Sequence, residues 1–387
     1  MPVWYQLNEE LILINVGVEI NDLLAQAKLI DIARPEKAVL LEKAVQLADS
    51  HNEIELGFTA RQELVRVCTF SGHPDKAIIA FSWCLGQNDK NPGRFDQWLL
   101  VWEYKWVVLA LIKFPQIPLE KIAEFMEDAG RRLEEYEGGR RALYQLRAWQ
   151  YQNMGLMDEE QRAYEEWQSS PRGVWGFRKG MSNCRACEIS DDVYHHILWS
   201  RDREAIDAAK PLLAQQVTCE SSGKSIFGMV LVPLVRLGEL DKAQIYHRTG
   251  YRLISTNLTF LDSVAGHINY LTIVNDLDKA VKLFGKHLIW ALEAAALTDV
   301  FEFYLASRLL FTRLIESRQM IKLRLPKAFP LYKRDGEYDV EALTSWFDEQ
   351  LHSIATKFDA RNKTDYFKGR IDQSQLQALF LPSNEIS

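Results

Sequence analysis

Residues 174–250 decide the fold, because they contain two near-copies of one helical hairpin in tandem. The turns inside these two copies read Ser200-Arg-Asp-Arg-Glu-Ala205 and Gly238-Glu-Leu-Asp-Lys-Ala243. Each turn has a turn-forming residue, then polar residues that include an acid, then an alanine that opens a second helix. A Gly or Asn ends the first helix in a left-handed turn, the acid lies near the positive end of the second helix, and the small alanine lets the two helices approach closely. We call this pattern the turn phrase.

The turn phrase recurs along most of the chain. Its further copies are Arg34-Pro-Glu-Lys-Ala38, Gly72-His-Pro-Asp-Lys-Ala77, Gly155-Leu-Met-Asp-Glu-Glu160 and Asn275-Asp-Leu-Asp-Lys-Ala280, with a degenerate copy at Gln116-Ile-Pro-Leu-Glu-Lys-Ile122. Successive copies follow at steps of 39, 45, 38, 45, 38 and 37 residues, which is the period of a helical-repeat solenoid. Apolar residues recur at intervals of three and four, as in Leu231, Leu234 and Val235, so the sequence predicts an all-α chain.

This pattern resembles the tetratricopeptide repeat (TPR) family over roughly residues 20–300. The resemblance is strongest in residues 141–171, where aromatic, small and turn residues fall at the family's preferred places: Tyr144, Ala148, Tyr151, Gly155, Tyr164 and Pro171. The family's period is about 34 residues, so the longer steps here indicate extended helices or loops between repeats. The resemblance implies a right-handed α-solenoid of antiparallel helical hairpins.

We expect the solenoid to cover residues 1–320 and a helical cap to cover residues 321–387. After Arg324 the turn phrase stops, Leu325-Pro-Lys-Ala-Phe-Pro330 breaks the helix twice, and residues 339–358 have the pattern of a final amphipathic helix. Such a cap covers the apolar face that the last hairpin of an array otherwise exposes. The tail after Leu381 is expected to be mobile.

Length and charge narrow the class of protein. A chain of 387 residues exceeds the usual size of a single core, which favours several domains or a repeat array. A net charge of -7 predicts no nucleic-acid partner and no anionic membrane partner.

The first residues lack the basic and apolar segments of a signal peptide, and the longest wholly apolar run, residues 107–112, is far too short to span a membrane. We therefore expect a cytoplasmic protein, whose five cysteines serve as buried thiols, metal ligands or redox groups rather than as disulfides.

Three of these cysteines, Cys184, Cys187 and Cys219, fall near the starts of first helices in neighbouring hairpins. Since neighbouring helices pack about 8 to 10 Å apart, the three thiols could converge at one edge. Cys-x-x-Cys at a helix start suits a tetrahedral zinc, and a helix N-terminus favours thiolates. Three interpretations stay open: free thiols, a redox pair, or a structural zinc with a fourth ligand from residues 169–183 or from Glu220, His195, His196 or His247. Cys68 and Cys84 lie inside predicted helices and are interpreted as packing residues.

The first helices carry a second candidate site. In the resembled family, side chains at certain first-helix positions line the concave groove, and here those positions hold Gln62, Arg66, Gln145, Trp149, Gln152, Asn153 and Asn269. Amides, an arginine and a tryptophan suit an extended peptide, whose backbone needs donors and acceptors. A solvated helix face is an equally good explanation of the same residues.

Two other patterns do not predict a functional site. His247, His267 and His287 are spaced by 20 residues, which is no ligand spacing on one helix, so we expect interior histidines. Ser222-Gly-Lys-Ser225 resembles the end of a phosphate loop but has Thr218 where that loop needs glycine. With no catalytic motif in view, the sequence predicts a non-enzymatic scaffold that binds a peptide or partner protein. The alternative is a regulator that responds to zinc or to thiol oxidation.

Overall fold

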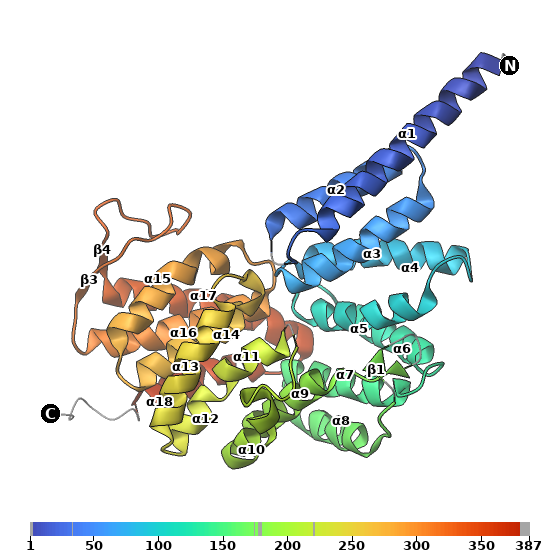
Figure 1. Cartoon of the computed structure of the whole chain (residues 1–387). Helices are drawn as coiled ribbons and strands as arrows, with labels where there is room; N and C mark the ends of the chain where they lie inside the picture. The colour runs from blue at the N-terminus through green and yellow to red at the C-terminus, as the bar shows by residue number, and fades with distance from the viewer. Residues whose placement is uncertain (1–2, 33, 174, 177–179, 220, 380–387) are drawn as a thin grey trace. The chain divides into compact units, whose positions relative to one another are not determined.

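The computed structural model describes residues 3–32, 34–173, 175–176, 180–219 and 221–379. The chain divides into two compact units, residues 1–111 and 112–387. Nearly all described elements are helices joined into hairpins (Figure 1). The prediction of an all-α solenoid of antiparallel hairpins is therefore confirmed. The boundary expected near residue 320 stays a prediction, and the tail after Leu381 lies outside the described residues.

The first unit is built from five helices that follow one another: α1 (Val3–Lys28), α2 (Pro35–Ser50), α3 (Ile54–Phe70), α4 (Pro74–Lys90) and α5 (Gln97–Ile112). Each of the first three packs on the next one along the chain. Aromatic rings join α5 to its neighbours, because Tyr104 lies edge-on to Phe81 at 4.9 Å and Trp106 lies edge-on to Phe70 at 5.1 Å.

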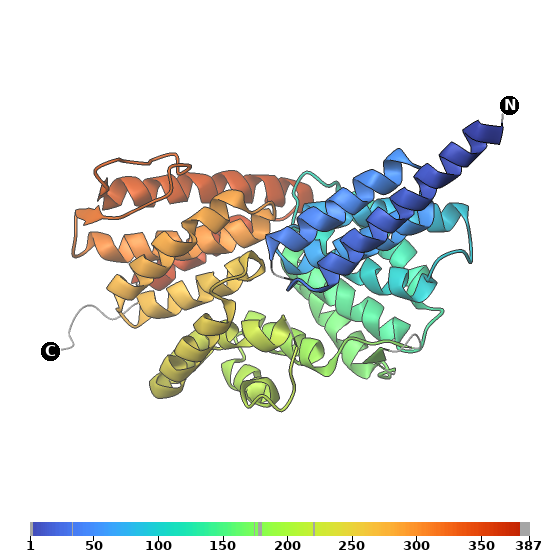
Figure 2. The same cartoon turned by 45° about the horizontal axis from the view of Figure 1, so that its top comes forward.

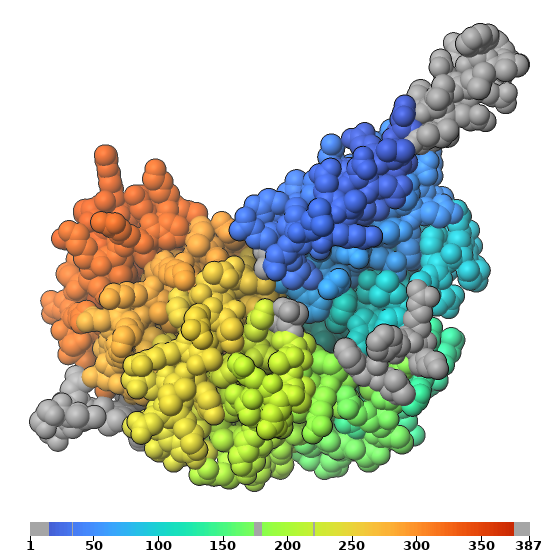
Figure 3. Space-filling view, in the orientation of Figure 1, coloured from blue at the N-terminus to red at the C-terminus, as the bar shows by residue number. Residues whose placement is uncertain are grey.

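The second unit continues the same design. It begins with the helices α6 (Leu119–Leu133), α7 (Gly139–Met154), α8 (Met157–Ser169), α9 (Arg185–Leu198), α10 (Asp202–Leu213), α11 (Ser222–Met229), α12 (Leu231–Arg236), α13 (Leu240–Ile254), α14 (Leu261–Ile273) and α15 (Leu277–Glu293). They are followed by α16 (Leu297–Ile315), α17 (Val340–Asn362) and α18 (Tyr366–Leu379). Figure 2 shows α14 to α17 side by side. In Figure 3 the surface of this unit runs in chain order from green through yellow to orange, as expected for hairpins that pack successively.

The turn phrase has the predicted geometry. Its first residue adopts a left-handed conformation, with φ between 55° and 84°, in five copies: Gly72, Gly155, Ser200, Gly238 and Asn275. Its closing alanine is fully buried in four copies: Ala77, Ala205, Ala243 and Ala280. The first copy differs, because Arg34 has φ of -87° and Pro35 opens α2 instead. A left-handed residue and a small buried one thus set the angle between paired helices.

Two short antiparallel β-hairpins interrupt the helices. One pairs β1 (Trp175–Gly176) with β2 (Gly180–Met181), and the other pairs β3 (Met320–Lys322) with β4 (Glu337–Asp339) between α16 and α17. These strands were not predicted, because two or three residues are too few to show the alternation that marks a strand. The amphipathic helix expected at 339–358 corresponds to α17.

The end of the second unit returns to its beginning. The Arg361 guanidinium donates hydrogen bonds to the carbonyl oxygens of Ile112 and Phe114, at 3.0 and 2.9 Å. The Thr364 hydroxyl donates to the Met154 carbonyl at 3.2 Å. Next to it, Tyr366 lies so close to Gly155 that any Cβ at position 155 would collide with its ring. The segment between α17 and α18 therefore ties the last hairpin to the start and to the middle of the same unit.

Candidate functional site

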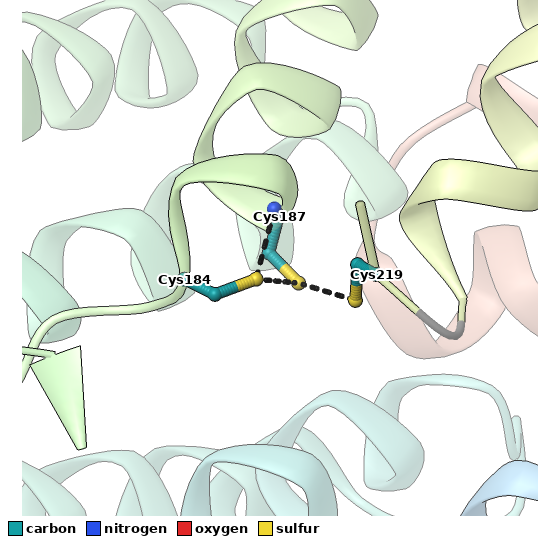
Figure 4. A group of neighbouring side chains, drawn as sticks. All are labelled: Cys184, Cys187 and Cys219. Atoms are coloured by element: carbon teal, nitrogen blue, oxygen red, sulfur yellow. Dashed lines mark hydrogen bonds between the residues drawn. The ribbon is translucent and has the colours of Figure 1, made fainter. Parts of the chain in front are cut away.

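The three predicted thiols lie together between the starts of α9 and α11. Cys184 is the N-cap of α9, and its sulfur accepts a hydrogen bond from the Cys187 amide at 3.4 Å. The Sγ atoms of Cys184 and Cys187 are 3.3 Å apart, and that of Cys219 lies 3.7 Å from Cys187 (Figure 4). All three Sγ atoms lie within 4.8 Å of one another. We call this group the thiol cluster.

The spacing of the thiol cluster suits a tetrahedral metal. Four sulfurs at a zinc–sulfur distance of about 2.3 Å are about 3.8 Å from one another, close to the separations seen here. Half-buried positions leave all three sulfurs within reach of a metal ion. Hydrogen bonding to Cys184 and Cys187 lowers the pKa of Cys219, and the same bonding raises the pKa of Cys187. A thiolate in this cluster is therefore stabilised by hydrogen bonds from its neighbours.

A fourth ligand does not come from the histidines considered in the sequence. His195 Nδ1 lies 2.8 Å from Glu160, His196 Nε2 lies 3.8 Å from Asp192, and His247 Nδ1 lies 2.9 Å from His267. No other His, Cys, Asp or Glu of the described residues completes the thiol cluster. Glu220 lies outside those residues. The nearest polar side chains are hydroxyls, since Ser222 donates to the Cys187 sulfur at 3.4 Å.

The two remaining cysteines lie in the interior, as their positions inside helices indicated. Cys68 and Cys84 are buried, and burial raises the pKa of Cys68 to about 12. Both therefore stay neutral thiols at physiological pH and serve as packing residues.

Several of the groove residues bind their own chain. Gln145 is 3% exposed; its amide nitrogen donates to Asp191, and its oxygen accepts from Asn183 at 3.0 Å. Gln152 is 5% exposed. Asn153 donates to the Trp149 carbonyl, one turn back in α7, at 2.8 Å. The crevice that Gln145 and Gln152 line with residues of α8 and α9 measures about 10 Å³, which is too small for a ligand.

The other groove positions are more open. Gln62, Trp149 and Asn269 are half-buried, and Arg66 is exposed. Within the second unit, Trp149 and Asn269 are therefore more accessible to a peptide than the buried Gln145 and Gln152.

A buried polar cluster at α8 and α9 was missed. Glu160 and His195 are 0% and 1% exposed, and the Glu160 carboxylate accepts from His195 Nδ1 at 2.8 Å and from Trp199 Nε1 at 2.9 Å. The Tyr164 ring stacks on His195 with centroids 3.5 Å apart. A signal was present in the sequence: Glu160 stands where five of the seven turn-phrase copies have alanine. A charged side chain at this position is buried between two helices. It therefore needs a hydrogen-bonding partner, and the next hairpin is the neighbour that can supply one.

The three histidines spaced by 20 residues are interior, as predicted. His247, His267 and His287 are buried on α13, α14 and α15, where His247 hydrogen-bonds to His267, and His287 lies 3.0 Å from the Tyr251 hydroxyl. Burial lowers their pKa values to about 4, 3 and 4 respectively.

These lowered pKa values make part of the stability depend on pH. In the unfolded chain a histidine has a pKa of about 6.5, so between pH 6.5 and 4 the unfolded state binds more protons than the folded state. The contribution of each neutral buried histidine to the free energy of unfolding is therefore complete above pH 6.5 and is lost as pH falls towards 4. We expect His287→Gln to be less stable than the wild type at pH 7, with a difference that narrows by about 1 kcal/mol for each unit of acidification below pH 6.

Urea denaturation of the wild type and of His287→Gln at pH 7, 6 and 5 checks this prediction. His352→Gln is the matched control, because the His352 side chain is 49% exposed. Direct comparison with a variant is needed because burial raises the pKa of Asp191 to about 7, so protonation of this group stabilises the folded state as pH falls. A difference that stays constant with pH would contradict the prediction.

Comparisons with known proteins do not assign the chain to a family. No protein-family model matches the chain, and no curated protein matches it. One similar solved structure is described as "Crystal structure of APC/C hetero-tetramer Cut9-Hcn1", with 10% identity and a TM-score of 0.47. That match covers 92% of this chain, which spans only 62% of the matched chain. Within the described residues, no helix is long and apolar enough to cross a bilayer. By the geometry of its own hairpins, the chain has a TPR-like helical-repeat fold.

Proposed function

We propose that the protein is a non-enzymatic scaffold that holds a peptide or partner protein along the first helices of its hairpins. The observation that carries this proposal is the repeated hairpin itself, with a left-handed turn residue and a buried small residue in successive copies. Repeats of this kind build an extended surface that contacts a partner at many points. Arg66, Trp149 and Asn269 are the accessible side chains that we assign to it. A cytoplasmic location and the absence of a nucleic-acid partner stay predictions from composition.

Capture of a partner from extracts of the native host tests this proposal. We expect Trp149→Ala to abolish capture with little change in melting temperature, because a half-buried aromatic ring in the groove would stack on the ligand rather than in the core. Arg162→Ala is the matched control, since Arg162 is exposed on α8, the second helix of the same hairpin. Equal losses of binding and stability would show that Trp149 belongs to the core, and the groove proposal would lapse.

The thiol cluster supports a second candidate function. We propose that zinc bound by Cys184, Cys187 and Cys219 holds the start of α9 to the residues before α11. A chain that loses this metal, or that oxidises two of the three thiols, would have a looser junction between these hairpins. The protein would then be a regulator whose partner-binding surface responds to zinc or to oxidants.

A further inference from the structure

Between α16 and α17 the chain leaves the helical pattern for residues 316–339, which we call the β3–β4 insertion. Figure 1 shows it as an extended loop beside the ends of these two helices. The insertion contributes four buried side chains to the core of the second unit: Leu323, Leu325, Phe329 and Tyr338. Phe329 packs edge-on against Trp346 of α17 with centroids 4.8 Å apart. The surface of the insertion is therefore held in place before any partner arrives.

That surface carries an excess of positive charge. Residues 322–334 include five cations and no acid: Lys322, Arg324, Lys327, Lys333 and Arg334. All five are exposed. None forms an ion pair with another described residue. Glu337 lies opposite Lys322 in the β3–β4 pairing, and residues 316–339 together hold six cations and four acids, so the insertion keeps a patch of net positive charge in a chain whose net charge is -7.

The patch contains a pocket. It measures about 360 Å³ and lies between residues 322–325 and residues 332–336. Lys322 and Arg324 come from one of these segments, and Lys333 and Arg334 come from the other, so an anion in the pocket would meet cations from both. The one acid in its lining, Asp335, accepts the Glu337 backbone N–H at 3.0 Å. Two large apolar side chains of the insertion are exposed, Met320 at 52% and Tyr332 at 38%, and Tyr332 also lines the pocket.

We propose that the β3–β4 insertion is a docking site for an acidic segment of a partner protein. This inference rests on the proposed scaffold function and supplies the chemistry of the partner. Carboxylates would pair with Arg324 and Arg334, while apolar side chains between them would contact Tyr332 and Met320. A short segment fits better than a long polyanion such as nucleic acid, because the acidic remainder of the chain would repel charge beyond the patch.

The test uses the full chain and a fluorescein-labelled peptide, Glu-Glu-Leu-Glu-Glu-Leu-Glu-Glu, followed by fluorescence anisotropy. We expect this peptide to bind, a peptide with lysine in place of glutamate not to bind, and the affinity to fall as salt is raised. Arg324→Glu combined with Arg334→Glu should weaken binding by about tenfold or more. Arg252→Glu combined with Lys282→Glu is the matched control, with the same change in charge at exposed positions outside the insertion. The control should bind within about twofold of wild type.

Failure of the peptide to bind, or an equal loss in both double variants, would overturn the docking site. Vesicles of phosphatidylserine and phosphatidylcholine that sediment the wild type but not the Arg324→Glu/Arg334→Glu variant would instead assign the patch to a membrane. Millimolar inorganic phosphate that displaces the peptide completely would assign it to phosphate groups. If the acidic peptide fails but the wild type still captures a partner through Trp149, the scaffold stands and only the docking site falls. If both assays fail, neither proposal holds.

Discussion

Replacing Cys187 with serine should release about one equivalent of zinc and lower the free energy of unfolding by several kcal/mol, because structural zinc contributes directly to folding. Cys187 lies between the other two thiols, 3.3 Å from the Cys184 sulfur and 3.7 Å from the Cys219 sulfur. The metal would join the start of α9 to the connection before α11, and removal of the middle ligand breaks that link. An inert thiol would tolerate the same change at a cost of about 1 kcal/mol.

Elemental analysis of the purified chain, with thermal melts in the presence and absence of chelator, measures both effects. Cys84→Ala is the control for zinc content: it removes a buried thiol outside the thiol cluster, so it should destabilise the core and leave the zinc content unchanged. The zinc proposal is wrong if protein expressed with ample zinc contains none of it and all three thiols titrate freely. A plain repeat scaffold would remain.

Glu160→Ala should destabilise the chain by about 3 to 5 kcal/mol, although alanine is the usual residue at this position of the turn phrase. The substitution leaves Nδ1 of the buried His195 and Nε1 of the half-buried Trp199 without their acceptor. A buried donor without a partner costs its full desolvation free energy, and no new contact compensates for it.

Urea denaturation at pH 7 measures this loss. Glu159→Ala is the matched control, because Glu159 is the adjacent residue and its side chain is 42% exposed beside Arg162; we expect a change within about 0.5 kcal/mol. Glu160→Ala combined with His195→Leu and Trp199→Phe should recover part of the loss, since it removes the donors along with the acceptor. Equal stabilities of Glu160→Ala and Glu159→Ala would show that the cluster contributes nothing.

The hairpins could be predicted from the sequence because their determinants are local. A left-handed turn at Gly238 and a small residue at Ala243 act within a few residues of one another, and repetition makes the signal stronger. The meeting of Cys187 and Cys219 could be predicted for the same reason, since equivalent positions in neighbouring hairpins lie side by side. Whether the thiol cluster holds metal depends on a fourth ligand, which repetition does not specify.

The partners of individual side chains could not be predicted in the same way. Gln145 and Asn153 fall at positions that face a groove in the resembled family, yet one binds Asp191 and the other its own helix. Those choices depend on rotamers and on what the next hairpin offers. The helix break at residues 325–330 was predicted, but strands β3 and β4 were missed because each is three residues long and their order comes from Phe329 and Tyr338 packing in the interior.

The return of the chain end to the start of the second unit has a consequence for synthesis on the ribosome. An open repeat array can fold hairpin by hairpin as it emerges, because each repeat needs only its neighbours. Here Arg361 bonds to a carbonyl 249 residues earlier, and Thr364 to one 210 residues earlier. At about 5 to 20 residues per second, the carbonyl of Ile112 waits on the order of 12 to 50 s for its partner. During that interval the surface around Gly155 is uncovered, so the nascent chain is most exposed to misassembly and to chaperones just before its last residues are made.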